Sequence, residues 1–160
     1  MIKTLAGCIR EYKKQTILTP VFIVFEVMLE CVIPFIISRF VNEIKAGCDF
    51  SEILKYSGVL ILMAVLSLVF GALAGNTCAT ASCGFAKNLR KDMFYKIQTY
   101  SFENIDKFST ASLVTRLTTD INNIQMAFMM IIRIAIRAPL MMIFAFTMAF
   151  IMGGKLAFVF

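Results

Sequence analysis

A long stretch without any charged residue constrains this chain more than any other feature. From Tyr56 through Ala86 every side chain is uncharged, and most are apolar. A helix rises about 1.5 Å per residue, so about 20 such residues cross the roughly 30 Å hydrocarbon core of a bilayer. The stretch exceeds that length and therefore predicts a membrane-spanning helix. Composition agrees, because 59% of the residues are hydrophobic, against about 45–50% in soluble domains.

Two further apolar segments predict two further spans. One runs from Ile17 to Ile37 and is interrupted only by Glu26 and Glu30, and the other is free of charge from Ala138 to Gly154. The first apolar run starts late and contains two carboxylates, unlike a cleaved signal peptide, so we expect the N-terminus to be retained. The predicted fold class is an all-α membrane protein with three long transmembrane helices.

The cysteines favour neither a metal site nor a disulfide scaffold. The chain has five cysteines and no histidine, and no pair has C-x-x-C spacing. They are Cys8, Cys31, Cys48, Cys78 and Cys83.

Basic residues gather before the first span and between the second and third. The first group is Lys3, Arg10, Lys13 and Lys14, and the second is Lys87, Arg90, Lys91, Lys96, Lys107 and Arg116. By the positive-inside rule both regions are cytoplasmic, which gives a multi-pass protein of the cell (plasma) membrane with a cytoplasmic N-terminus. The net charge of +6 is explained by this flanking role, so we expect no nucleic-acid partner.

The predicted helices are longer than a bilayer requires. An amphipathic elbow is expected over about residues 1–14, followed by spans over about 16–43, 53–100 and 110–153, with a fourth span beginning about residue 155. The second and third spans extend past the inner boundary by similar lengths because their helical periodicity continues. We therefore expect a cytoplasmic hairpin whose tip lies at residues 101–108.

The sequence at this tip resembles the first cytoplasmic loop of ABC exporters. Residues 101–125 read S-F-E-N-I-D-K-F-S-T-A-S-L-V-T-R-L-T-T-D-I-N-N-I-Q. The family's pattern is a short coupling helix with aromatic residues, followed by T-G-x-L-x-x-R-L-x-x-D. The matching residues here are Thr110, Leu113, Arg116, Leu117 and Asp120.

Ala111 replaces the glycine that is usual in this pattern. The segment F-S-T-A-S-L-V-T-R-L-T-T-D is similar to the corresponding segment of bacterial heterodimeric multidrug exporters, in which the glycine is commonly lost. The resemblance therefore implies a second, different half-transporter as partner rather than a homodimer.

The resemblance covers the whole chain and implies a partial ABC exporter transmembrane domain, with three of its six helices. It also implies a nucleotide-binding domain that is absent from this sequence and would bind ATP and Mg. The sequence has no G-x-x-x-x-G-K-[ST] motif, so this chain should hydrolyse no ATP and bind no cofactor by itself.

The resemblance assigns coupling to the nucleotide-binding domain to the tip. The residues are Phe102, Glu103, Asn104, Ile105, Asp106 and Phe108. Thr110 can cap the following helix, and Arg116 with Asp120 forms an i, i+4 pair able to brace the hairpin. An ordinary loop with a surface ion pair is the alternative for these residues.

Glu26 and Glu30 lie one turn apart inside the first span, where an exposed charge costs at least about 2.5–3.5 kcal/mol. One interpretation places them on the translocation path, where they favour hydrophobic or cationic small-molecule cargo. In the other, each is protonated or paired with a basic or hydroxyl group of another helix. Arg133 and Arg137 are expected to reach lipid headgroups at the inner interface, and contact with cargo is the alternative.

Two functions of other classes compete with the exporter. The first is a small three-span accessory or regulatory membrane protein that binds another complex. The second is an enzyme of the membrane interface, which the absence of histidine and of any Ser-His or Cys-His pair disfavours.

Overall fold

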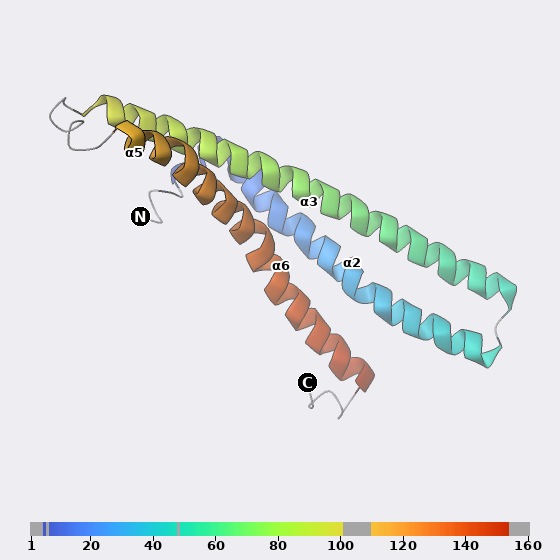
Figure 1. Cartoon of the computed structure of the whole chain (residues 1–160). Helices are drawn as coiled ribbons and strands as arrows, with labels where there is room; N and C mark the ends of the chain where they lie inside the picture. Colours follow the sequence, from blue (N-terminus) through green and yellow to red (C-terminus); the bar gives the residue numbers. More distant parts are fainter. Residues whose placement is uncertain (1–4, 6, 48, 101–109, 154–160) are drawn as a thin grey trace.

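The chain folds into three long helices, of which the computed structural model describes residues 5, 7–47, 49–100 and 110–153. Within these residues there are helices and no strands. The order is a 3-10 turn η1 (Arg10–Tyr12), α2 (Lys13–Ala46), α3 (Phe50–Gln98), α5 (Thr110–Thr115), a π-helical turn η2 (Arg116–Asp120) and α6 (Ile121–Gly153). Figure 1 shows α2 and α3 side by side as antiparallel rods, with α6 leaning away from them toward its C-terminal end.

Three helical stretches are long and apolar enough, by length and composition, to cross a membrane. They are Arg10–Ala46, Phe50–Gln98 and Ala111–Ile151. This confirms the predicted all-α membrane fold with three long helices. The first helix starts earlier than its apolar residues do, because Lys13 already belongs to α2. The last part of the expected elbow is therefore continuous with the first span.

A tight turn joins α2 to α3. Gly47 ends α2 in the left-handed conformation, with φ of 83°, and its N–H bonds the carbonyls of Glu43 and Ile44. Only glycine adopts this conformation without a steric penalty, which explains why the helix ends here. Asp49 then precedes α3 in an extended conformation.

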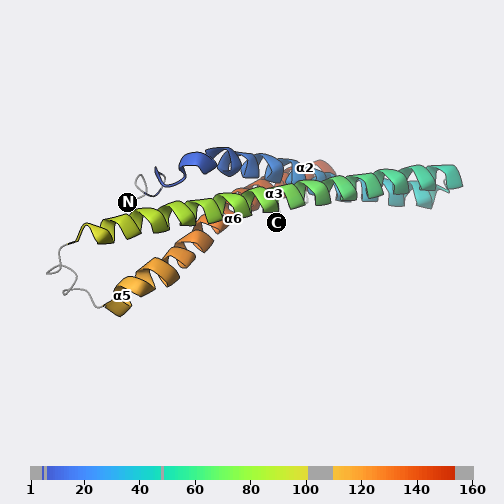
Figure 2. The ribbon, with the colours of Figure 1, turned by 90° about the horizontal axis from the view of Figure 1, so that it is seen from above.

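At the opposite end, α3 contacts η2. Figure 1 shows the last turns of α3 and the helix α5 at the same end of the molecule. Figure 2 shows that α5 and α3 diverge toward that end, while α6 runs back across α3. The two arms form the expected hairpin, and its loop lies outside the described residues.

A face of small residues on α3 allows the helices to pack closely. Ala74, Cys78, Ala81 and Ser82 are each no more than 1% exposed. Small side chains let helix backbones approach in a membrane, where van der Waals packing takes the place of the hydrophobic effect. Ala74 packs with Ile23 and Val27 of α2, whereas Cys78 and Ala81 pack with Ile132 of α6.

Polar contacts and stacked rings connect the same helices. The Thr19 hydroxyl of α2 donates a hydrogen bond to the Thr77 hydroxyl of α3 over 3.0 Å. Toward the hairpin, Phe85 of α3 stacks on Phe128 of α6 with ring centroids 4.5 Å apart. These contacts place the three helices in one assembly rather than as independent spans.

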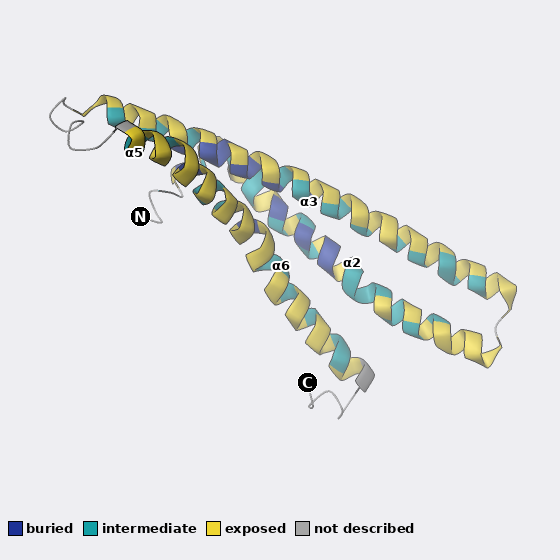
Figure 3. Cartoon of the chain, in the orientation of Figure 1, coloured by how far each residue is buried: buried dark blue, intermediate teal, exposed yellow. Residues whose placement is uncertain are grey.

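Buried residues concentrate where all three helices meet, and the remaining surface is open. In Figure 3 the dark blue residues lie on α2 and α3, while the ends near the α2–α3 turn are largely yellow. In the most apolar stretch of each span, only 17%, 6% and 0% of the residues are buried within the chain. The exposed apolar surface is suited to lipid and to further helices.

Candidate functional site

Two regions carry the predicted functional residues: the hairpin tip and the acidic residues of the first span. The predicted coupling residues lie outside the described residues. They are Phe102, Glu103, Asn104, Ile105, Asp106 and Phe108. Their role stays a prediction, whereas the arms that hold them and the acidic residues of the first span are described.

The bracing residues lie at the base of the hairpin tip. Thr110 is the first residue of α5, and Arg116 and Asp120 are the two ends of the π-helical turn η2, with exposed side chains. π-turns inside helices are rare and occur often at functional sites. The bracing pair itself stays a prediction.

A different residue of the opposite arm contacts this turn. Arg90 of α3 donates from Nε to the Leu117 carbonyl over 3.3 Å and from Nη2 to Asn122 Oδ1 over 3.2 Å. A π-turn replaces i→i+4 hydrogen bonds with i→i+5 bonds, so its carbonyls have altered partners and accept from outside the helix. From the sequence, Arg90 is expected only as one of the basic residues that orient the chain in the membrane. Its contact with η2 depends on how α3 packs against the other arm.

The acidic pair of the first span, Glu26 and Glu30, is bound by an arginine of the third. Arg137 Nη1 donates to Glu26 Oε1 over 3.0 Å, and its Nη2 lies 2.8 Å from both carboxylate oxygens of Glu30. The two carboxylates are one helical turn apart, so a single planar guanidinium bonds both. This arrangement joins α2 to α6 by a charged contact within the membrane-spanning region.

Burial differs across this contact. The Glu26 side chain is 8% exposed, whereas those of Glu30 and Arg137 are 30% and 32% exposed. Gly71 of α3 leaves room for the buried carboxylate, because a Cβ at this position would lie 2.9 Å from Glu26 Oε1. Glu26 Oε2 is buried and has no hydrogen-bond partner within the described residues.

A hollow of about 500 Å³ lies beside the acidic pair. Arg133, one turn before Arg137 on α6, lines it together with Glu26 and Glu30. Its other walls are mainly small and apolar: Ile33, Ala64, Ser67, Leu68, Gly71 and Ala72. We call Glu26, Glu30, Arg133 and Arg137 the charge cluster.

This geometry corrects the expectation for Arg137 and bears on the two interpretations of the acidic pair. Arg137 faces protein carboxylates, so its expected contact with lipid headgroups is wrong. The interpretation in which both glutamates pair with a basic group of another helix describes this conformation, and a role on the translocation path stays a prediction. A count of residues from the span boundaries predicted that Glu26 lies deeper in the membrane than Arg137. The count was wrong because, in helices tilted against each other, residues at different distances along the chain lie at the same depth.

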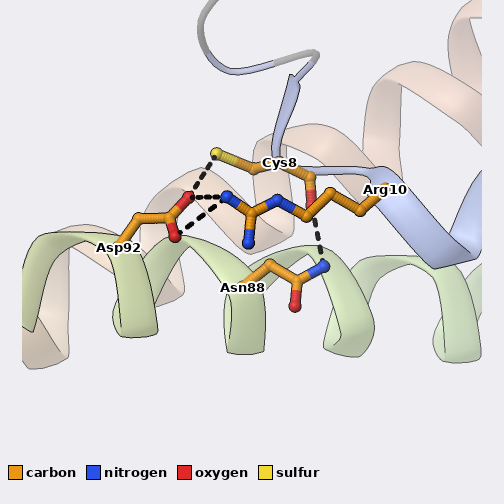
Figure 4. A network of polar contacts seen from close by, with 4 residues as sticks. All are labelled: Cys8, Arg10, Asn88 and Asp92. Atoms are coloured by element: carbon orange, nitrogen blue, oxygen red, sulfur yellow. Dashed lines mark hydrogen bonds and ion pairs between the residues drawn. The ribbon is translucent and has the colours of Figure 1, made fainter. Parts of the chain in front are cut away.

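The N-terminal turn is attached to the same long helix. Arg10 Nη2 contacts both carboxylate oxygens of Asp92 at 3.1 and 3.2 Å, and Asn88 Nδ2 donates to the Cys8 carbonyl over 2.9 Å. The Cys8 thiol lies 3.7 Å from Asp92 Oδ2, and Figure 4 shows these four residues together. Burial raises the pKa of the Cys8 thiol, and the negative charge of Asp92 raises it further.

This attachment was not predicted from the sequence. Arg10 has a positive φ of 36°, a conformation that costs a non-glycine residue of order 1–3 kcal/mol. The ion pair with Asp92 and the packing of Cys8 against Phe85 and Ile121 stabilise the turn. Because Arg10 and Asp92 are more than eighty positions apart, no local pattern reveals their contact.

No metal centre is formed within the described residues, since they contain no group of three or more His, Cys, Asp or Glu side chains placed to hold an ion. The chain was compared with known protein families. The family described as the ABC transporter transmembrane region matches residues 16–160. That match includes all three long helices and the hairpin.

Individual relatives are named as ABC transporter ATP-binding proteins. The chain is 31% identical to an uncharacterized ABC transporter ATP-binding protein, YfiB, of Bacillus subtilis, over 83% of this chain and 23% of that protein. It is 26% identical to a putative ABC transporter ATP-binding protein, exp8, of Streptococcus pneumoniae, over 78% of this chain and 21% of the relative. A relative from Mycobacterium tuberculosis, MT1311, is 23% identical over 88% of this chain and 24% of its own length.

The chain thus spans less than a quarter of the length of these relatives. The family match begins within α2 and runs to the end of the sequence. The resemblance inferred from the hairpin tip is confirmed at the level of the family. This chain belongs to the ABC transporter transmembrane region family and is a multi-pass membrane part of an ABC transporter.

Proposed function

We propose that this chain forms part of the translocation pathway of an ATP-driven exporter and carries its first cytoplasmic coupling loop. The observation that supports this most is the joint extension of α3 and α5–η2–α6 beyond the length a bilayer needs. Arg90 connects the two arms at η2, so a displacement of the tip is transmitted to both spans. A loop on a flexible linker would lack this property.

The proposal assigns the energy source to a domain outside this chain. A nucleotide-binding domain binds ATP and Mg, contacts the tip through Phe102, Ile105 and Phe108, and moves it on dimerisation. The basic side chains on this part of α3, including Lys87 and Lys91, favour a cytoplasmic location for the hairpin and the N-terminus, in the plasma membrane.

Partner and cargo follow from two further features. Ala111 in place of the usual glycine supports assembly with a second, different half-transporter. The acidic pair supports a hydrophobic cargo with a positive charge, because Glu26 and Glu30 already bind a guanidinium inside the membrane region.

The coupling loop is tested by replacing Phe102 and Phe108 with alanine in the full-length transporter. Apolar contacts at the centre of an interface commonly dominate its energy, so we expect ATP-dependent transport in vesicles to fall at least several-fold while basal ATP hydrolysis persists. Val114→Ala is the matched control, because Val114 is an exposed apolar residue of α5 beyond the tip. Retained transport by the double variant would contradict the coupling role.

A further inference from the structure

We propose that Arg137 is an internal counter-ion that competes with a singly charged organic cation for the acidic pair. The inference rests on the proposed export function, and it adds how the cargo site is closed and opened. In the described conformation the guanidinium occupies the place where cationic cargo would bind. Cargo binds when α6 withdraws Arg137 from Glu26 and Glu30.

The geometry shows that the acidic pair is a competent cation site. Three oxygens, Glu26 Oε1 and both of Glu30, lie within 3.0 Å of the Arg137 nitrogens. A guanidinium and a ligand cation satisfy carboxylates by the same electrostatic attraction. The site therefore binds positive charge, and the identity of the bound cation depends on which one has access.

Two observations distinguish an exchangeable contact from a permanent one. Glu30 and Arg137 are each about one-third exposed and so remain accessible to a competitor. The Glu26 side chain is more than nine-tenths buried, yet Oε2 has no partner within the described part of the chain. A permanent buried ion pair normally has its remaining lone pairs satisfied, whereas this conformation leaves one Glu26 acceptor without a donor within the described residues. A ligand that enters when Arg137 withdraws can bond it.

The charges of the cluster indicate the charge of the cargo. With both glutamates ionised, two carboxylates and the guanidinium groups of Arg133 and Arg137 sum to zero. Removing Arg137 from the site leaves two negative charges and one positive charge, a net charge of −1. A cation of charge +1 restores neutrality, whereas an anion or a dication does not.

The walls of the hollow indicate what surrounds that charge. Ile33, Ala64, Leu68 and Ala72 line about 500 Å³ beside the carboxylates. Small ligand sites of this volume are typically apolar with a few placed polar groups. The site is thus suited to an organic cation with an apolar body and not to a hydrated metal ion.

The position of Arg137 connects this exchange to the hairpin. Arg137 belongs to α6, which continues through η2 and α5 to the tip, whereas Glu26 and Glu30 belong to α2. A displacement of α6 relative to α2 separates the guanidinium from the carboxylates. Breaking the pair leaves Glu26 as an uncompensated buried charge, which needs a replacement cation that the cargo supplies.

The test measures binding of tetraphenylphosphonium and tetraphenylborate to the full-length transporter. These probes have nearly the same size and shape and opposite charge. In Arg137→Gln the internal competitor is absent, so tetraphenylphosphonium should bind several-fold more tightly and tetraphenylborate should not. Arg39→Gln is the matched control, because Arg39 stacks on the Phe35 ring of α2 and its loss changes net charge equally without touching the cluster.

A second measurement does not depend on the stability of that variant. Nitroxide labels at the exposed residues Met28 of α2 and Ile134 of α6, in a background lacking other reactive cysteines, report the distance between the helices. Tetraphenylphosphonium should lengthen it and tetraphenylborate should leave it unchanged. An unchanged distance with bound tetraphenylphosphonium, or unaltered affinity in Arg137→Gln, would overturn the inference.

The outcomes separate this inference from the proposed export function. If the transporter exports cargo with ATP but Arg137→Gln leaves the probe affinity unaltered, the internal counter-ion is rejected and the export function is not. The expected affinity change and helix separation, without any ATP-driven movement of a cation, support the counter-ion and reject export.

Discussion

Single atoms decide how the charge cluster is held. A hydrogen at Gly71, in place of a side chain, leaves the space that the Glu26 carboxylate occupies. The nearby Gly75 has a looser environment, because a Cβ there would lie 4.0 Å from Arg133 Nη1 and meet nothing closer. Two glycines one turn apart in the same helix therefore have different sensitivities to an added methyl group.

Gly71→Ala should destabilise the transporter, and Gly75→Ala should not. Alanine stabilises a helix interior by roughly 0.5–1 kcal/mol relative to glycine, which is the expected effect at Gly75. At Gly71 the overlap with Glu26 Oε1 outweighs this gain, because that oxygen is buried and held by Arg137 and cannot move aside freely. Overpacking of this kind typically costs about 1–3 kcal/mol. Thermal denaturation of the detergent-solubilised protein, followed by size-exclusion chromatography, checks the order, and equal melting temperatures would reject it.

A second residue-scale prediction concerns the Cys8 thiol. Burial and then Asp92 raise its pKa, so less thiolate is present at neutral pH and maleimide labelling is slow. Asp92→Asn removes a negative charge and should shift the pH midpoint of labelling downward. Glu11→Gln is the control, because Glu11 is exposed and takes no part in the Figure 4 network; the same midpoint in all three proteins would contradict the prediction.

At the scale of elements, the two arms of the hairpin are connected by one side chain at a structural irregularity. The turn η2 interrupts a helix that otherwise runs from Thr110 to Gly153, and Arg90 bonds a carbonyl within it. The α6 arm is thus held to α3 between the tip and the membrane. Such a contact lets the hairpin move as one body.

Arg90→Met should loosen η2 without unfolding the bundle. The lost hydrogen bonds are solvent-exposed, so we expect a cost of about 1 kcal/mol and faster amide hydrogen exchange in residues 116–122. Lys91→Met is the control, since Lys91 lies over the Tyr95 ring of its own helix and forms no hydrogen bond to η2 within the described residues. Unchanged exchange in Arg90→Met would show that Arg90 does not hold the turn.

At the scale of the whole molecule, the three helices leave most of their apolar surface unpaired. None of the residues in the most apolar stretch of the third span is buried within the chain. Such a surface is suited to contact with lipid and with other helices.

The 160-residue chain expressed alone should therefore aggregate in detergent. Light scattering coupled to size-exclusion chromatography should detect heterogeneous assemblies, because surfaces shaped for other helices associate with one another. The full-length transporter, purified in the same detergent, is the control and should elute as one species. A monodisperse monomer of the short chain would contradict this expectation.

Several features of the chain were predictable because they depend on local pattern. The uncharged stretch from Tyr56 to Ala86 predicts a span since its length alone matches the bilayer. The long helical periodicity predicts the overshoot, and the residues around Thr110 predict the family. The two interpretations of Glu26, a place on the translocation path or a pair with another helix, followed from the sequence. A carboxylate within a span requires either water or a partner.

The tertiary structure alone decided which partners meet. Arg137 lies more than one hundred positions from Glu26, and Arg10 more than eighty from Asp92. No periodicity within a helix encodes how far one helix slides or tilts against another. Those quantities follow from the close packing of small side chains on α3, and they turned an arginine expected among lipid headgroups into the counter-ion of the acidic pair.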